Sequence, residues 1–307
     1  MADLTAEANR LLKASMAENL WQTYKAAVDS FDHFRYIFCL QQLWPAPVDH
    51  IVHFIAYLSA KNQAPATIRT YISGLSYRHK IHGLSDATKS FIVTKLLEGV
   101  TRSSQHRDTR APITFNILVQ IIQALDHVCE SSYEVFLFRA AFSLAFYGFL
   151  RVGELTSKSL KSLDPRPLRL GDIDIETISG HKQVKMTIRQ SKTDQVGQST
   201  TLYLLGTGGP TCPVTSLSKF LAVRHQNSSV DSQLLVHFDG NPLTRYQFST
   251  ILGKTLKFCN INKGHFRSHS FRIGAATEAA MRGIPDTLIK QWGRWKSGAY
   301  TSYIRLQ

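Results

Sequence analysis

The chain has 307 residues, of which 43% are hydrophobic and 19% are charged. This length and composition predict a globular protein with two domains and exclude a largely disordered chain. Lys and Arg number 36 against 22 Asp and Glu, and the formal net charge of +14 favours encounter with a polyanion. Charge alone leaves nucleic acid, acidic substrates and anionic membranes open as partners.

The four cysteines, Cys39, Cys129, Cys212 and Cys259, are widely separated and lack the paired spacing of zinc ligands. We therefore expect reduced thiols, with neither a disulfide framework nor a metal site. The N-terminus has no basic start followed by an apolar run, and the most apolar stretch, 136–150, is too short to span a bilayer. The sequence thus predicts an intracellular protein without a membrane-spanning segment.

Residues 1–100 are predicted to form a helical domain. Apolar side chains recur at helical spacing in 20–40, 48–58 and 67–75. Pro45 and Pro47 separate two of these helices, and Pro65 begins the third. We expect four or five helices, ending near residue 100.

Residues 101–112 are polar, basic and poor in large apolar side chains, which predicts a linker between two domains. The linker could follow a nucleic-acid backbone or serve only as a solvated hinge. Basic charge is concentrated after it, since 1–108 carry a net charge of +3 and 109–307 a net charge of +11. The last part, 251–307, has 10 basic residues against two acidic ones, which indicates a phosphate-facing surface.

Residues 113–307 are predicted to form a mainly helical second domain with one small sheet. The spacing predicts helices over 113–128 and 133–150. Over 172–206 the helical spacing ends and apolar and polar residues alternate instead. Turn signals at Ser179-Gly180 and over 192–197 divide this stretch, which predicts a three-stranded antiparallel sheet. Helices resume near residue 214. The predicted fold class is therefore mainly α, with a helical domain followed by a mixed α/β domain.

Near the end of the chain, His269 and Arg272 are three residues apart and share one face of a predicted helix. Ser268 or Ser270 is expected to cap that helix, whose N-terminal amides would then help to hold a phosphate. A His-x-x-Arg pair by itself is more often structural than functional.

Arg151 follows the most apolar predicted helix, and Glu154, one turn later, is the expected partner that orients it. An isolated pair of this kind is usually a simple helical salt bridge. Lys192 lies in the predicted turn between the second and third strands, where a lysine is normally only solvated. Over a phosphate, however, it could protonate a leaving alkoxide.

A further short helix is predicted to begin at Pro285-Asp286 and to end at Gly293, and aromatic residues follow it in the most basic part of the chain. These are Trp295, Tyr300 and Tyr303. Taken alone, a tyrosine near a terminus is usually a packed amphipathic side chain.

Six residues in order, Arg151, Lys192, His269, Arg272, Trp295 and Tyr303, resemble the catalytic residues of the tyrosine recombinases, the phage integrase family. This family shares its chemistry with type IB topoisomerases. The resemblance covers nearly the whole chain. It implies a core-binding-like DNA-binding domain over 1–100, a linker over 101–112 and a catalytic domain over 113–307.

The resemblance implies that Tyr303 attacks a phosphate of double-stranded DNA, giving a 3′-phosphotyrosyl link and a 5′-hydroxyl. Arg151 and Arg272 would neutralise the phosphate oxygens and His269 would assist proton transfer. Lys192 would protonate the leaving oxygen, Trp295 would donate its indole N–H, and Glu154 would hold Arg151. The family's chemistry requires no metal, cofactor or ATP.

The segments LRVGEL, SKTDQ and HSFRIGAAT resemble recombinases of eukaryotic mobile elements of the DIRS, Ngaro and Crypton types, which implies a nuclear protein. The chain departs from the family pattern in two places. Trp295 stands where most members have histidine, about one residue closer to the tyrosine than usual, so Arg294 is an alternative occupant and Tyr300 a rival nucleophile. Only four residues follow Tyr303, so we expect weaker or differently organised tetramers on DNA.

Two other functions remain open. A type IB topoisomerase would cut in the same way and reseal the same strand. A catalytically silent, domesticated DNA-binding protein would retain the fold without the reaction.

Overall fold

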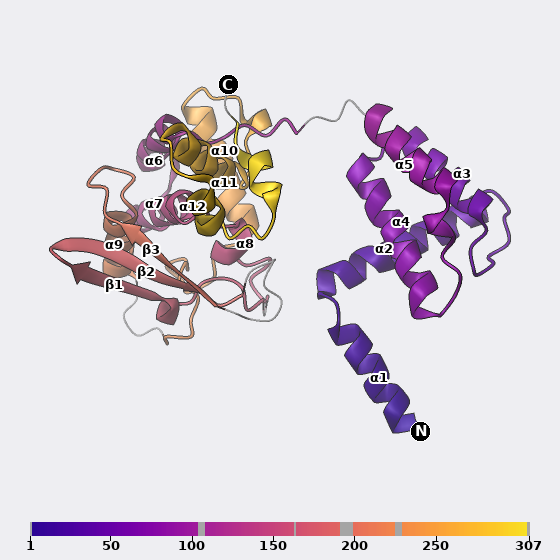
Figure 1. Cartoon of the computed structure of the whole chain (residues 1–307). Coiled ribbons are helices and arrows are strands. Elements are labelled where there is room, and N and C mark those ends of the chain that lie inside the picture. The colour runs from indigo at the N-terminus through magenta and orange to yellow at the C-terminus, as the bar shows by residue number, and fades with distance from the viewer. Residues whose placement is uncertain (1, 104–107, 163, 191–198, 225–228, 306–307) are drawn as a thin grey trace. The chain divides into compact units, whose positions relative to one another are not determined.

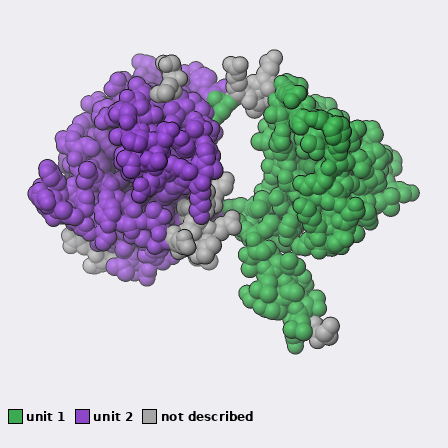
Figure 2. Space-filling view, viewed as in Figure 1, with its two compact units in different colours: residues 1–108 green, residues 109–307 purple. Residues whose placement is uncertain are grey.

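The computed structural model describes residues 2–103, 108–162, 164–190, 199–224 and 229–305. The chain forms two compact units, residues 1–108 and 109–307 (Figure 2). Each unit has its own hydrophobic core. Lys192 lies outside the described residues, so its predicted place in the site stays a prediction.

Unit 1 is helical, as predicted. Its elements are α1 (Ala2–Ala14), α2 (Glu18–Ile37), α3 (Val48–Ala60), α4 (Pro65–Ile81), a 3₁₀ turn η1 (Ala87–Lys89) and α5 (Phe91–Ser103). Pro65 occupies the first turn of α4, where its missing N–H costs nothing. The apolar faces of α2, α3 and α4 meet in a core that includes Phe31, Phe34, Phe54 and Leu75.

Both ends of the predicted linker are structured. Helix α5 continues to Ser103, and Thr101 near its end accepts a hydrogen bond of 2.8 Å from Arg69 of α4. At the other end, the main-chain N–H of Ala111 donates to the His265 carbonyl (2.8 Å). The polar residues there are thus held by hydrogen bonds that their composition does not reveal.

Unit 2 contains the predicted helices and sheet (Figure 1). The elements before the sheet are α6 (Phe115–Val128), α7 (Ser132–Tyr147), α8 (Val152–Leu155) and η2 (Leu170–Asp172). The strands are β1 (Ile173–Ile178), β2 (His181–Ile188) and β3 (Thr200–Leu205). The elements after it are α9 (Pro213–Val223), α10 (Arg245–Phe258), η3 (Lys263–His265), α11 (Ser270–Met281), α12 (Asp286–Trp292) and η4 (Gly298–Tyr303).

The three strands form one antiparallel sheet in the order β1-β2-β3, which confirms the predicted topology. Met186 in the central strand pairs with Ile173 on one side and Leu202 on the other. Val184, Met186 and Ile188 are buried, so one face of β2 covers the helical core. In Figure 1 the sheet lies along one side of the helices of unit 2.

Helix α7 is the centre of this core. Most of its residues are buried, and Phe142 packs 5.1 Å, ring to ring, from both Phe248 and Phe271. Helix α11 packs closely because its residues are small. A Cβ on Gly274 would lie 1.8 Å from the carbonyl oxygen of Ile113, so only glycine permits this approach. The packing places the first turn of α11 beside the C-terminal end of α7.

None of the helices described here has both the length and the hydropathy needed to cross a bilayer.

Candidate active site

The chain reverses direction after α7, and this reversal positions the first arginine. Gly148 ends the helix and Phe149 adopts the left-handed conformation (φ 48°). Arg151 then becomes the residue before α8, and Glu154 lies within that short helix. The carboxylate of Glu154 accepts the Arg151 main-chain N–H (2.9 Å) and its Nη1 (3.2 Å), so the predicted pairing of these two residues is present.

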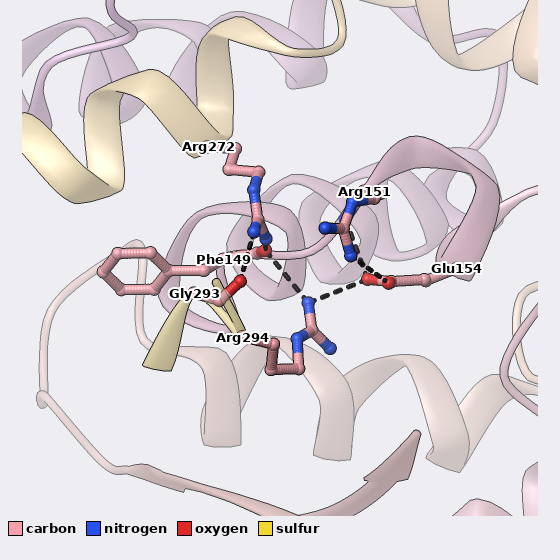
Figure 3. Close-up of polar contacts among 6 residues, drawn as sticks. All are labelled: Phe149, Arg151, Glu154, Arg272, Gly293 and Arg294. Carbon is pink, nitrogen blue, oxygen red and sulfur yellow. Dashed lines mark hydrogen bonds and ion pairs between the residues drawn. The ribbon is translucent and has the colours of Figure 1, made fainter. Parts of the chain in front are cut away.

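A second arginine shares that carboxylate. Arg294 Nη2 donates to Glu154 Oε2 at 2.9 Å and to the Phe149 carbonyl oxygen at 3.1 Å. Figure 3 shows Arg294 approaching Glu154 and Phe149 from the side opposite Arg151 and Arg272. The Arg294 side chain is only 6% exposed. Arg294 thus contacts the Glu154 carboxylate from the side opposite Arg151.

The third arginine, Arg272 in the first turn of α11, is fully buried. Its Nη1 donates to the carbonyl of Phe149 and its Nη2 to the carbonyl of Gly293 (Figure 3). These two acceptors fix the plane of the guanidinium. Arg272 lies beside Arg151 (Figure 3). Its described hydrogen-bond acceptors are both main-chain carbonyls, and neither is a carboxylate.

Trp295 covers this guanidinium. Its ring centroid lies 4.1 Å from Arg272 Cζ, the distance of a cation–π contact. The ring also lies against Gly293, where an added Cβ would be 1.6 Å from it, so glycine is required there. The indole Nε1 is buried and has no hydrogen-bond partner among the described residues, which makes it a donor available to a bound group.

Tyr303 completes the cluster from the last turn of η4. Its ring centroid lies 4.9 Å from that of Trp295, 5.0 Å from that of His269 and 5.6 Å from Arg272 Cζ. Thr277 in α11 anchors the chain around it, because its hydroxyl donates to the Tyr303 carbonyl (3.3 Å) and accepts the Arg305 N–H (3.0 Å). The phenol is thereby held beside the imidazole and the guanidinium.

Tyr300 is engaged elsewhere. Its hydroxyl donates to Asp286 Oδ2 at 2.8 Å, and this hydrogen bond raises the pKa of the Tyr300 phenol. Its ring lies 6.4 Å from Trp295. The Tyr300 hydroxyl is thus held by the Asp286 carboxylate.

The cluster carries more positive than negative charge. Three guanidiniums, Arg151, Arg272 and Arg294, surround one carboxylate, Glu154. Burial, together with the charges of Arg151 and Arg294, lowers the pKa of Arg272 to about 9. Burial also lowers the pKa of Arg294. A bound anion would relieve this cost, because an opposite charge nearby favours the protonated form.

Residues 113–306 match the phage integrase family. The chain belongs to this family. It is a tyrosine recombinase, and the predicted family and enzyme class are confirmed. No curated protein matches the sequence.

Solved structures of two integrases and one site-specific recombinase share the fold at low sequence identity. A lambda integrase dimer bound to a COC′ core site has a TM-score of 0.63 at 16% identity, covering 99% of this chain and 77% of that one. A XerH recombinase bound to a palindromic difH substrate has a TM-score of 0.64 at 15% identity, covering 92% and 74%. A Tn1549 transposon integrase in complex with transposon right end DNA has a TM-score of 0.63 at 12% identity, covering 99% and 94%.

In this member of the phage integrase family the structure brings together five of the six predicted catalytic side chains and the supporting Glu154. The sixth, Lys192, lies outside the described residues. Of the two candidates beside Tyr303, Trp295 packs on Arg272, whereas Arg294 pairs with Glu154. Among the described residues, no cluster of three or more His, Cys, Asp or Glu side chains is arranged to hold a metal ion.

One local expectation was wrong. Neither Ser268 nor Ser270 caps α11 in this integrase, because His269 is the residue before the helix and makes no side-chain cap hydrogen bond. A tight turn precedes the helix, in which the Ser270 N–H donates to the Arg267 carbonyl (2.8 Å) and the Ser270 hydroxyl accepts the Arg267 N–H (3.1 Å).

Sequence reasoning also missed the carbonyl groups of Phe149 and Gly293 and the anchoring hydroxyl of Thr277. Main-chain acceptors leave no side-chain signature. Gly293, which precedes Arg294 and Trp295, was the only sequence feature that indicated close packing at this point.

Proposed function

We propose that this tyrosine recombinase cleaves and rejoins double-stranded DNA in site-specific recombination, with Tyr303 as the covalent nucleophile. The observation that carries the proposal is the packing of the Tyr303 phenol against His269, Trp295 and Arg272, beside a buried excess of positive charge. The solved integrases that share its fold are complexes with DNA, which supports DNA as the partner.

In the cleavage step, the Tyr303 oxygen attacks phosphorus and the bond from phosphorus to the 5′-oxygen breaks. His269 takes the phenol proton, because its ring lies beside that of Tyr303. Arg151 and Arg272 neutralise the charge that develops on the non-bridging oxygens, and guanidinium suits this role because it donates two parallel hydrogen bonds. The product is a 3′-phosphotyrosyl link and a 5′-hydroxyl.

Two donors complete the step. The indole N–H of Trp295, which lacks a partner among the described residues, donates to a phosphate oxygen. Lys192, outside the described residues, protonates the departing 5′-oxygen. Rejoining reverses these transfers when a 5′-hydroxyl of another strand attacks the link. The link conserves the energy of the phosphodiester, so the reaction requires no ATP, and the arginines supply the charge neutralisation without a metal or cofactor.

The finer proposals rest on sequence resemblance. The motifs favour the DIRS, Ngaro or Crypton type of eukaryotic mobile elements, with an intracellular and, in a eukaryote, nuclear location. We further propose that unit 1 binds DNA as the core-binding domain and that strand exchange requires several protomers on DNA.

The test is covalent capture. Wild-type protein is incubated with a pool of radiolabelled suicide duplexes of random sequence, each nicked so that cleavage releases a short strand and cannot reverse. Adducts are isolated under denaturing conditions and their DNA is sequenced. We expect adducts with the wild-type protein and with Tyr300→Phe, and none with Tyr303→Phe.

The outcomes of this experiment distinguish the proposed recombinase from the two alternative functions. No adduct from any duplex would favour the silent DNA-binding protein, provided that the chain still binds DNA. Adducts without sequence preference, together with relaxation of a supercoiled plasmid, would favour a topoisomerase. An adduct lost in Tyr300→Phe but retained in Tyr303→Phe would refute the proposed nucleophile.

A further inference from the structure

Within the arginine cluster, Arg294 is a buried arginine that the proposed reaction does not use. Its backbone is left-handed (φ 55°), a conformation that residues with a Cβ rarely adopt. Its side chain is 6% exposed, and its Nε and Nη1 have no hydrogen-bond partner among the described residues. A strained, buried cation of this kind persists only where its surroundings hold it, and such residues concentrate at functional sites.

Among the described residues, the side-chain hydrogen bonds of Arg294 all come from one nitrogen, Nη2. Nη2 donates to Glu154 Oε2 (2.9 Å) and to the Phe149 carbonyl (3.1 Å). Each of these acceptors also serves another arginine, since Glu154 binds Arg151 and the Phe149 carbonyl binds Arg272. Arg294 is therefore connected to both proposed phosphate ligands through groups that hold them.

We propose that Arg294 is a positioning residue, which fixes Glu154 and the Phe149 carbonyl so that Arg151 and Arg272 present their guanidiniums to one phosphate. This inference rests on the proposed function. Its geometry differs from that of a phosphate ligand, because Arg294 approaches the two acceptors from the side opposite Arg151 and Arg272 (Figure 3).

The physical reason lies in how one carboxylate is shared. Glu154 is 2% exposed, so it cannot exchange a lost partner for bulk water. With Arg294 in place, Arg151 holds Glu154 through one guanidinium nitrogen, Nη1, and keeps other donors for the phosphate. Without Arg294, Glu154 would draw Arg151 into a two-pronged pair and away from the substrate.

The test is a double-mutant cycle on covalent capture, with Arg294→Gln, Glu154→Gln and the double variant. Each single change should lower the rate of adduct formation at saturating DNA by about 10- to 100-fold, as loss of a supporting residue does. The DNA concentration for half-maximal rate should stay within about threefold, because ground-state binding is spread over many phosphates. The double variant should be no slower than the slower single variant, because both changes disable one unit.

A matched control comes from Glu278 of α11 and Arg282, the residue that follows this helix, which form an Arg–Glu pair with a hydrogen bond of 2.8 Å. The corresponding Gln variants should cleave at the wild-type rate. If the effects of Arg294→Gln and Glu154→Gln instead multiply in the double variant, Arg294 acts independently, and the proposal is overturned. A wild-type rate for Arg294→Gln would also overturn it.

A second variant distinguishes the loss of positioning from misfolding. Arg294→Gly removes the side chain but suits the left-handed backbone, so it should fold at least as well as Arg294→Gln. Its folded fraction is measured by circular dichroism at the assay temperature. A normal rate per folded molecule would reduce Arg294 to a structural residue and overturn the proposal. Absence of adduct with the wild-type protein would instead refute the proposed function.

Discussion

Two fully buried arginines, one in each unit, have opposite surroundings. In unit 1, Arg35 pairs with the Asp32 carboxylate, donates to the Leu43 carbonyl (2.8 Å) and lies 4.4 Å from the Phe31 ring centroid. In unit 2, Arg272 donates to two main-chain carbonyls and has Arg151 and Arg294 as charged neighbours. Both are 0% exposed.

The difference separates a structural cation from a proposed phosphate ligand. Arg35 has its own anion, so its charge is neutralised within the fold. Arg272 is fixed in place by two carbonyl dipoles, whereas the nearby carboxylate, Glu154, pairs with Arg151 and Arg294. Burial alone therefore does not mark an active site. Arg272 has two further cations beside it, so a bound anion would be stabilised there.

The largest expected effect is on Arg272. We expect Arg272→Gln to lower the rate of adduct formation by roughly 10²- to 10³-fold, because it removes a preorganised donor to the developing charge. The rate is measured with suicide duplexes at saturating DNA, and circular dichroism reports the folded fraction. A rate within about threefold of wild type would abolish the distinction between the two arginines.

For Arg35 we expect a loss of stability without a loss of cleavage activity. Arg35→Met should lower the free energy of unfolding by about 2–4 kcal/mol, because Asp32 and the Leu43 carbonyl lose their shared donor. Urea unfolding measures this loss. Cleavage per folded molecule should be unchanged, and a large fall in that rate would show that Arg35 is not purely structural.

Gly293 tests the packing that holds Trp295 over Arg272. Gly293→Ala should cost about 1–3 kcal/mol and lower the cleavage rate, because the new methyl group would overlap the Trp295 ring. Gly298→Ala is the matched control, since nothing lies within 4 Å of its added Cβ. Thermal melting and adduct formation are compared for both. Equal behaviour of the two variants would contradict the packing described here.

The smallest effect is on anion binding. Sulfate, compared with chloride at equal ionic strength, should raise the melting temperature by roughly 2–4 °C at pH 7, because it binds only the folded arginine cluster. Burial and the neighbouring arginines lower the pKa of Arg272, so a bound anion that offsets these charges stabilises the folded state. The sulfate effect should be much reduced in Arg151→Ala. An equal shift in Arg151→Ala would place the anion elsewhere.

Much of the fold was predictable because it depends on periodicity. The switch from helical spacing to alternation after residue 172 predicted the sheet, and Pro285 and Gly293 predicted both ends of α12. The boundaries near 101–112 were less clear, because there the chain is held by main-chain hydrogen bonds to His265 and Ser270.

The convergence of Arg151, His269, Arg272, Trp295 and Tyr303 followed from the family resemblance. No residue pattern alone could have predicted it, because these side chains lie in, or shortly before, three elements that are separated in the sequence. These elements are α8, α11 and η4. The sharing of Glu154 by Arg151 and Arg294 was not predictable, because it depends on left-handed backbone at Phe149 and Arg294, two residue types without such a preference. The place of Lys192 stays a prediction.

The central claim is that the Tyr303 phenol, beside these arginines, forms the bond to DNA. Mass spectrometry of the captured adduct tests it directly. Trypsin, followed by nuclease digestion, should release the peptide 297–305, SGAYTSYIR, carrying a nucleotide remnant, and backbone fragmentation distinguishes its two tyrosines. We predict the remnant on Tyr303, whereas a remnant on Tyr300 would contradict the account.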